Sequence, residues 1–98
     1  MSENGKTLYL PLKKEWYDMI ENEEKKEEYR EIKKFWTSRL CDGNKFKHFE
    51  YVCFSYGYTK RRMMFRIEEI VVSCGNPKWG AENGKEYYVI RIGERVNG

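Results

Sequence analysis

The sequence contains little histidine, proline or cysteine: one His, two Pro and three Cys in 98 residues. The cysteines, at 41, 53 and 74, are odd in number and lack the close spacing of a zinc site. Neither a disulfide framework nor a zinc site is therefore expected. Cys53 lies in an apolar run and is predicted to be a small core residue. We expect no metal and no organic cofactor.

Long apolar segments are also missing. The longest runs, such as residues 70–72, are far too short to span a bilayer, and residues 1–6 form no apolar signal segment. We expect a soluble, cytoplasmic protein without a membrane partner. The length suits one domain, residues 1–98, with an ordered core of about residues 7–96. Three Trp, eight Tyr and five Phe can supply that core.

Charge is distributed unevenly along the chain. The net charge is +3, yet residues 21–31 carry a net −3 and the remainder a net +6. An acidic island in a basic surround suits an anionic ligand that also offers a hydrogen-bond donor, but it is equally compatible with coincidence. A basic surplus this small does not by itself establish nucleic-acid binding.

The apolar pattern predicts the element order β-α-β-α-β-β-β. The expected strands cover residues 7–10, 25–32, 49–58, 63–73 and 86–96, and the expected helices cover 13–22 and 34–40. Pro11 is predicted to end the first strand because it cannot donate to a ladder. Trp16, Met19 and Ile20 are predicted to form the apolar face of the first helix. Together these elements predict an α+β domain whose strands curl into a small open β-barrel of about five strands with two short helices.

Three residues of the most charged stretch, Lys25, Glu28 and Arg30, have the spacing K-x-x-E-x-R. Taken alone, such a run is typical of a solvated helix face, or of internal ion pairs with no ligand. The apolar stripe of the first helix stops at Ile20, because Glu follows at the positions where it should recur. That interruption permits a strand in which Glu28 and Arg30 share one face and Tyr29 lies on the other.

In this context the chain resembles an ASCH domain of the PUA-like superfamily. The family signature, G-x-K-x-x-E-x-R, follows the first helix, and three of its four positions match here. The resemblance covers roughly residues 7–96, including the segments 10–12, 16–17 and 88–93. It is closest in character to small stand-alone ASCH-like proteins of bacteria and phages. Glu23 replaces the family Gly, and we expect Asn22 to take the left-handed turn conformation instead.

The resemblance implies that Lys25, Glu28 and Arg30 form the floor of a polar cleft that binds RNA or a nucleotide-like ligand. The side-chain chemistry suits that role. The Arg30 fork can clamp a phosphate or the acceptor edge of a base, and Glu28 can accept from an exocyclic amine. Lys25 is a compact cation for a phosphate or, if desolvated, for proton transfer.

A second group of residues mixes rings with cations, as single-stranded RNA binding requires. Its members are Tyr56, Tyr58, Lys60, Arg61 and Arg62. The alternative is a charged hairpin tip that keeps a strand edge soluble. Trp79, in a Gly/Pro-rich loop, is a further candidate for stacking on a base, or else it caps the end of the barrel.

Two other functions stay open at this stage. One ASCH branch resembles a small amidohydrolase acting on N4-acetylcytidine, in which the signature Lys activates a Thr at the position of Glu28. That nucleophile is missing here, which argues against this activity; if the chain is an enzyme, Lys25 and Glu28 are the expected catalytic residues. Thr37, Ser38 and Ser55 have no spacing that places them beside Lys25. The other alternative is a protein-interaction module. We expect a binding module rather than an enzyme.

Overall fold

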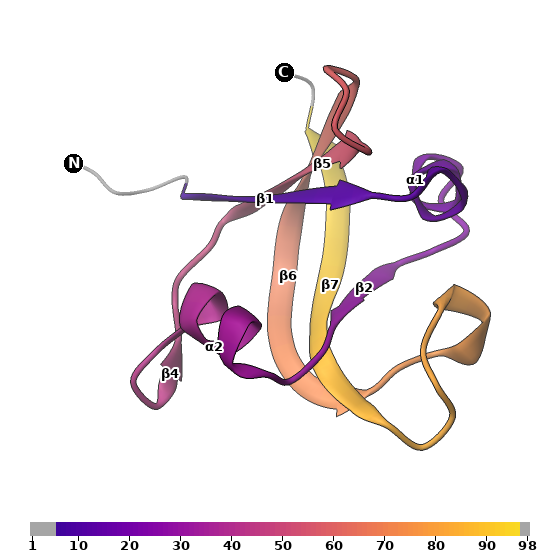
Figure 1. Cartoon of the computed structure of the whole chain (residues 1–98). Coiled ribbons are helices and arrows are strands. Elements are labelled where there is room, and N and C mark those ends of the chain that lie inside the picture. Colours follow the sequence, from indigo (N-terminus) through magenta and orange to yellow (C-terminus); the bar gives the residue numbers. More distant parts are fainter. Residues whose placement is uncertain (1–5, 97–98) are drawn as a thin grey trace.

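A curled five-stranded sheet forms the body of the molecule (Figure 1). The computed structural model describes residues 6–96. The elements are β1 (Thr7–Leu12), α1 (Lys14–Glu21), β2 (Glu27–Arg30), α2 (Lys34–Leu40), β3 (Cys41–Asp42), β4 (Lys45–Phe46), β5 (Tyr51–Tyr56), β6 (Arg62–Cys74), the 3-10 turn η1 (Pro77–Trp79) and β7 (Glu86–Val96). The strand order is β1-β5-β6-β7-β2, with β1 parallel to β5 and every other pair antiparallel.

The predicted α+β fold with an open barrel is confirmed for residues 6–96. The second helix and the last strand begin and end at the predicted residues, and the other elements lie within a few residues of theirs. The small hairpin of β3 and β4 was not predicted, because the sequence shows only its turn. No helix within the described range is long and apolar enough to cross a membrane. The segment 1–5, predicted to carry no signal sequence, lies outside that range.

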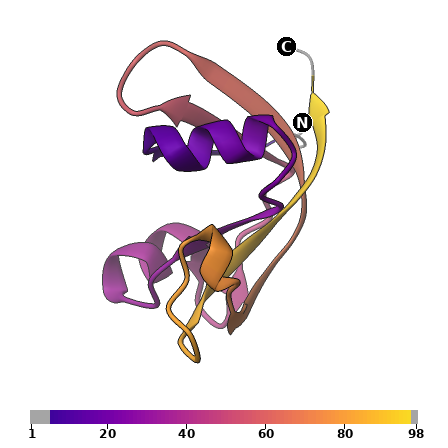
Figure 2. The same cartoon turned by 90° about the vertical axis from the view of Figure 1, so that its right-hand side faces the viewer.

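The interior is built mainly from strand residues. Leu8, Leu10 and Leu12 of β1 point into the main core while Tyr9 points outward, as alternation along a strand requires. Cys53 is buried, as predicted. β7 is covered on both faces, because Tyr87 and Val89 belong to a second, smaller cluster. Figure 2 shows both helices on one side of the curved β6–β7 pair.

The prediction that Pro11 ends the first strand is wrong. β1 continues to Leu12, and Pro11 is in register with Ser55. β1 is an edge strand of the sheet, so a residue without an N–H group is tolerated there. The carbonyl of Pro11 remains available to a partner outside the sheet.

The buried face of α1 differs from the predicted one. The fully buried residues of this helix are Tyr17 and Ile20, whereas Trp16 and Met19 are only half-buried. Tyr17 packs edge-to-face on Tyr56 of β5 with ring centroids 5.3 Å apart. The periodicity placed Tyr17 beside the apolar face of the helix, but its long side chain reaches the core from there.

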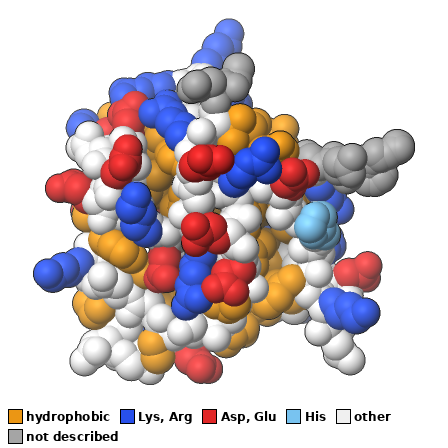
Figure 3. Space-filling model, turned by 180° about the vertical axis from the view of Figure 1, so that it is seen from behind, with side chains coloured by type: hydrophobic (Ala, Val, Ile, Leu, Met, Phe, Trp, Pro, Cys, Tyr) orange, Lys and Arg blue, Asp and Glu red, His pale blue; other side chains and the backbone are white. Residues whose placement is uncertain are grey.

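Seen from behind, the molecule shows cations and carboxylates side by side (Figure 3). Ion pairs include Arg66 of β6 with Glu50, the residue before β5, at 3.1 Å, and Arg91 of β7 with Glu69 of β6 at 2.5 Å. Opposite charges at such positions neutralise one another locally and add little stability at exposed sites.

The turn between α1 and β2 also differs from the expectation. Glu23, not Asn22, takes the left-handed conformation, with φ +66° against −83° for Asn22. The N–H groups of Glu24 and Lys25 both reach the carbonyl of Met19 through this turn. The chain thus keeps the turn that a Gly would make and accepts the steric penalty of a side chain there.

Replacing Glu23 with Gly should therefore stabilise the protein by about 0.5–1 kcal/mol, the left-handed penalty less the extra backbone entropy that Gly loses. Urea unfolding of Glu23→Gly and of the matched control Asn22→Gly measures this. The control, at negative φ, should gain nothing. Equal effects of the two substitutions would show that the left-handed turn does not limit stability.

Candidate functional site

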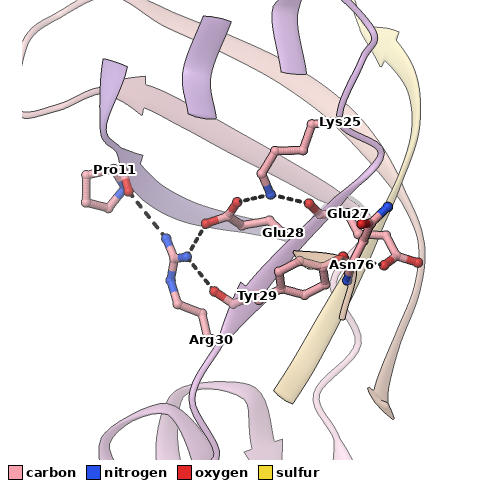
Figure 4. Close-up of polar contacts among 7 residues, drawn as sticks. All are labelled: Pro11, Lys25, Glu27, Glu28, Tyr29, Arg30 and Asn76. Carbon is pink, nitrogen blue, oxygen red and sulfur yellow. Dashed lines mark hydrogen bonds and ion pairs between the residues drawn. The ribbon is translucent and has the colours of Figure 1, made fainter. Parts of the chain in front are cut away.

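Lys25 follows the turn at Glu23 and is buried, with 1% of its surface exposed. Its ammonium Nζ donates to Glu28 Oε1 at 2.7 Å and also to the carbonyl of Glu27 (Figure 4). The rings of Trp16 and Tyr29 lie 5.6 and 5.0 Å from Nζ. Burial lowers the pKa of Lys25 from its ordinary value, and the Glu28 carboxylate acts in the opposite direction.

The Glu28 carboxylate lies between two cations. One oxygen, Oε1, accepts from Lys25, and the other, Oε2, forms an ion pair with the guanidinium of Arg30. Glu28 is 5% exposed, so the charge of this group is offset by protein partners and not by water. A buried carboxylate with both oxygens paired is the arrangement in which such a charge is tolerated.

Arg30 joins the two edges of the sheet. Besides Glu28, its guanidinium donates to the carbonyl of Tyr29 at 2.8 Å and to that of Pro11 at 3.3 Å. Pro11 belongs to β1 and Arg30 to β2, the two strands that end the strand order. The guanidinium also lies over the ring of Trp36, 5.1 Å from its centroid. This side chain therefore closes the open side of the barrel.

A cavity of about 330 Å³ opens beside this pair, which we call the cleft. Glu28 and Arg30 supply its charged wall, and all three tryptophans of the chain, Trp16, Trp36 and Trp79, line it. Lys25 lies behind Glu28 and borders a different hollow of about 570 Å³. Of the predicted floor, two residues thus face the cleft and the third supports them from behind.

The loop that carries Trp79 is held to β2 by hydrogen bonds. The Tyr29 hydroxyl donates to Glu27 Oε1 and accepts from the backbone N–H of Asn76, both at 2.8 Å. Burial raises the pKa of Tyr29 above its ordinary value, and the Glu27 carboxylate acts in the same direction. Gly75 permits this approach, because a Cβ there would lie 2.6 Å from Ala81 and 2.8 Å from the Tyr29 ring.

The basic hairpin tip forms a separate surface. The residues predicted for this surface lie where β5 connects to β6: Tyr56, Tyr58, Lys60, Arg61 and Arg62. None of these five residues lines the cleft. Tyr58 is 96% exposed and free to contact a partner. Arg61 instead bonds Glu21 at 3.0 Å and lies over the Tyr17 and Tyr56 rings, so part of this group supports α1.

The hydroxyl groups considered as nucleophiles are engaged away from Lys25. Thr37 shares a hydrogen bond of 2.5 Å with the Tyr88 hydroxyl, Ser38 donates to the Phe35 carbonyl, and Ser55 donates to the Gly57 carbonyl. None of these bonds brings a hydroxyl to the signature lysine. Within residues 6–96, no group of three or more His, Cys, Asp or Glu side chains is placed to hold a metal.

Sequence reasoning missed two walls of the cleft, Trp16 and Trp36. Trp16 was assigned to the apolar face of the first helix, and a half-buried helix Trp has the same spacing as a core Trp. A usable signal was their position, since each lies in the first turn of a helix that directly follows an edge strand of the sheet.

No family model, curated protein or solved structure matches the chain. The resemblance to the ASCH signature therefore stays a prediction.

Lys25→Met should destabilise the protein by roughly 3 kcal/mol, because it leaves a buried carboxylate with one of its two cations. The matched control is Lys26→Met, an exposed lysine whose nearest carboxylate, that of Glu23, is 3.9 Å away. This control should change stability by less than about 0.5 kcal/mol. Chemical unfolding at neutral pH measures both. Similar small losses in the two variants would contradict a charged buried network.

Proposed function

We propose that this chain is an ASCH-like domain that binds single-stranded RNA or a nucleotide-like ligand in the cleft. The observation that carries the proposal is the composition of the cleft wall. Every tryptophan of the chain borders a single cavity whose polar side is the Glu28–Arg30 pair. Aromatic faces around a paired donor and acceptor match a nucleobase, which has two flat faces and a hydrogen-bonding edge.

Arg30 has donors left for a ligand. Its five N–H groups include one engaged by Glu28, one by the Tyr29 carbonyl and one by the Pro11 carbonyl. Two remain for acceptors of a base or a phosphate. Glu28 adds an acceptor beside them, because each carboxylate oxygen has a second lone pair. The protein contacts hold both groups in place before a ligand arrives, which reduces the entropy lost on binding.

The size of the cleft limits what it can hold. A volume of about 330 Å³ is at the small end of ligand sites. It suits one base or nucleoside inserted edge first, rather than a duplex. Stacking on an aromatic side chain contributes about 1–3 kcal/mol per base, so a single seated base supports modest affinity.

The test is a titration with nucleoside monophosphates and with pools of short single-stranded RNA, at low and moderate salt. Arg30→Lys is the informative variant, because it keeps the charge and removes the planar fork. It should weaken binding of the preferred ligand by about 10- to 100-fold, as loss of a bidentate contact does. Binding should also weaken as salt rises if phosphates are contacted.

Arg62→Lys is the matched control, since Arg62 is exposed on the hairpin tip and outside the cleft. It should bind as the wild type does, and unfolding curves should show both variants folded. If Arg62→Lys loses binding and Arg30→Lys keeps it, the ligand does not bind in the cleft and the binding site is the hairpin. Absence of any binding by the wild type at low salt would refute the proposal.

A further inference from the structure

A further hollow, of about 320 Å³, lies at the other end of β1 from the cleft, and we call it the second hollow. Three cations line it, Lys6, Arg39 and Lys47, which come from the position before β1, from α2 and from the segment after β4. Among residues 6–96, no Asp or Glu lines it. Among the described residues, none of these three cations forms an ion pair. We call this group the basic triad.

The basic triad differs from three arginines elsewhere in the molecule that are paired with carboxylates. Arg61, Arg66 and Arg91 each have a carboxylate within 3.1 Å. Three neighbouring cations that have no paired carboxylate repel each other and create a local positive potential. Such a surface attracts an anion, and separate parts of the chain meet to form it.

A continuous row of side chains links the basic triad with the cleft. Arg30 lies over Trp36 at 5.1 Å, Trp36 meets Phe35 edge-on at 5.0 Å, and Arg39 lies over Phe35 at 4.6 Å. Trp36 lines the cleft and Arg39 lines the second hollow. The row therefore has a cation at each end and two aromatic rings between them.

Two rings in this region are exposed. Phe35 is 53% exposed on α2, and Tyr9, which lines the second hollow, is 62% exposed on β1. β1 itself borders both hollows, with Pro11 at the cleft and Tyr9 at the basic triad. Thr7 and Pro11 are about 13 Å apart along the strand, at about 3.3 Å per residue. An occupant of both hollows must therefore be longer than a mononucleotide.

We propose that this row is a binding track for an oligonucleotide: a single strand whose seated base occupies the cleft continues past Phe35 and Tyr9 to the basic triad, which contacts its phosphates. The inference rests on the proposed function and adds the extended ligand and its path to it. Rings that stack on bases beside cations that contact phosphates are the pattern of sequence-tolerant single-strand binding.

The test compares a nucleoside monophosphate with a single-stranded RNA oligonucleotide that contains the same base. The track variant combines Lys6→Gln, Arg39→Gln and Lys47→Gln. The control variant combines Lys14→Gln, Lys26→Gln and Arg95→Gln, three exposed cations outside the row, and has the same net charge. Both are titrated over a series of salt concentrations.

The track variant should bind the oligonucleotide at least tenfold more weakly than the control variant and bind the monophosphate equally well. The slope of log affinity against log salt should fall by about 2, since each single-strand phosphate contact contributes about 0.7. Equal oligonucleotide affinities and slopes in the two variants would overturn the track while the cleft proposal stands. If an acidic peptide of equal charge binds as tightly as the oligonucleotide, the surface belongs to a protein partner and the track is wrong.

A different result would refute the proposed function itself: a wild-type protein that binds neither the monophosphate nor the oligonucleotide. That result would overturn the track as well. Arg30→Lys, which should weaken both ligands, and the track variant, which should weaken only the longer one, therefore report on the two proposals independently.

Discussion

The structure depends on one buried carboxylate. Glu28 lies inside the protein with a cation on each oxygen, and each cation connects it to a different part of the fold. Lys25 joins it to the turn after α1, and Arg30 joins it to the far edge of the sheet through the Pro11 carbonyl. Desolvating three charges is costly, and the arrangement is stable only because the partners satisfy one another. The geometry of the cleft follows from that requirement.

β2, a strand of four residues, positions most of the groups around the cleft because its side chains alternate between two faces. Glu28 and Arg30 share one face, as strand alternation predicts, and form the charged wall of the cleft, while Glu27 and Tyr29 lie on the other face. Those two hold the loop of Trp79 through Asn76 and bond Arg91 of β7. One face therefore places the polar groups of the cleft, and the other places a ring beside them.

The elements were predictable where the cause was local. The second helix and β7 were located by periodicity, and the shared face of Glu28 and Arg30 in β2 followed from the alternation of side chains along a strand. Other features depended on how the elements pack in space. Pro11 stays in a strand because β1 is an edge strand, and Trp36 lines the cleft beside Arg30, whose guanidinium lies over its ring. The basic triad likewise could not be inferred, since its members are separated by 33 and 8 positions in the chain.

The central claim is that the three tryptophans and the Glu28–Arg30 pair form one ligand site and not only a structural network. The most direct measurement is the NMR signal of the three indole N–H groups during titration with a nucleoside monophosphate. The account predicts that the signals of Trp16, Trp36 and Trp79 all shift, with a common dissociation constant. Three unchanged indole signals, while a ligand is shown to bind the folded protein, would contradict it.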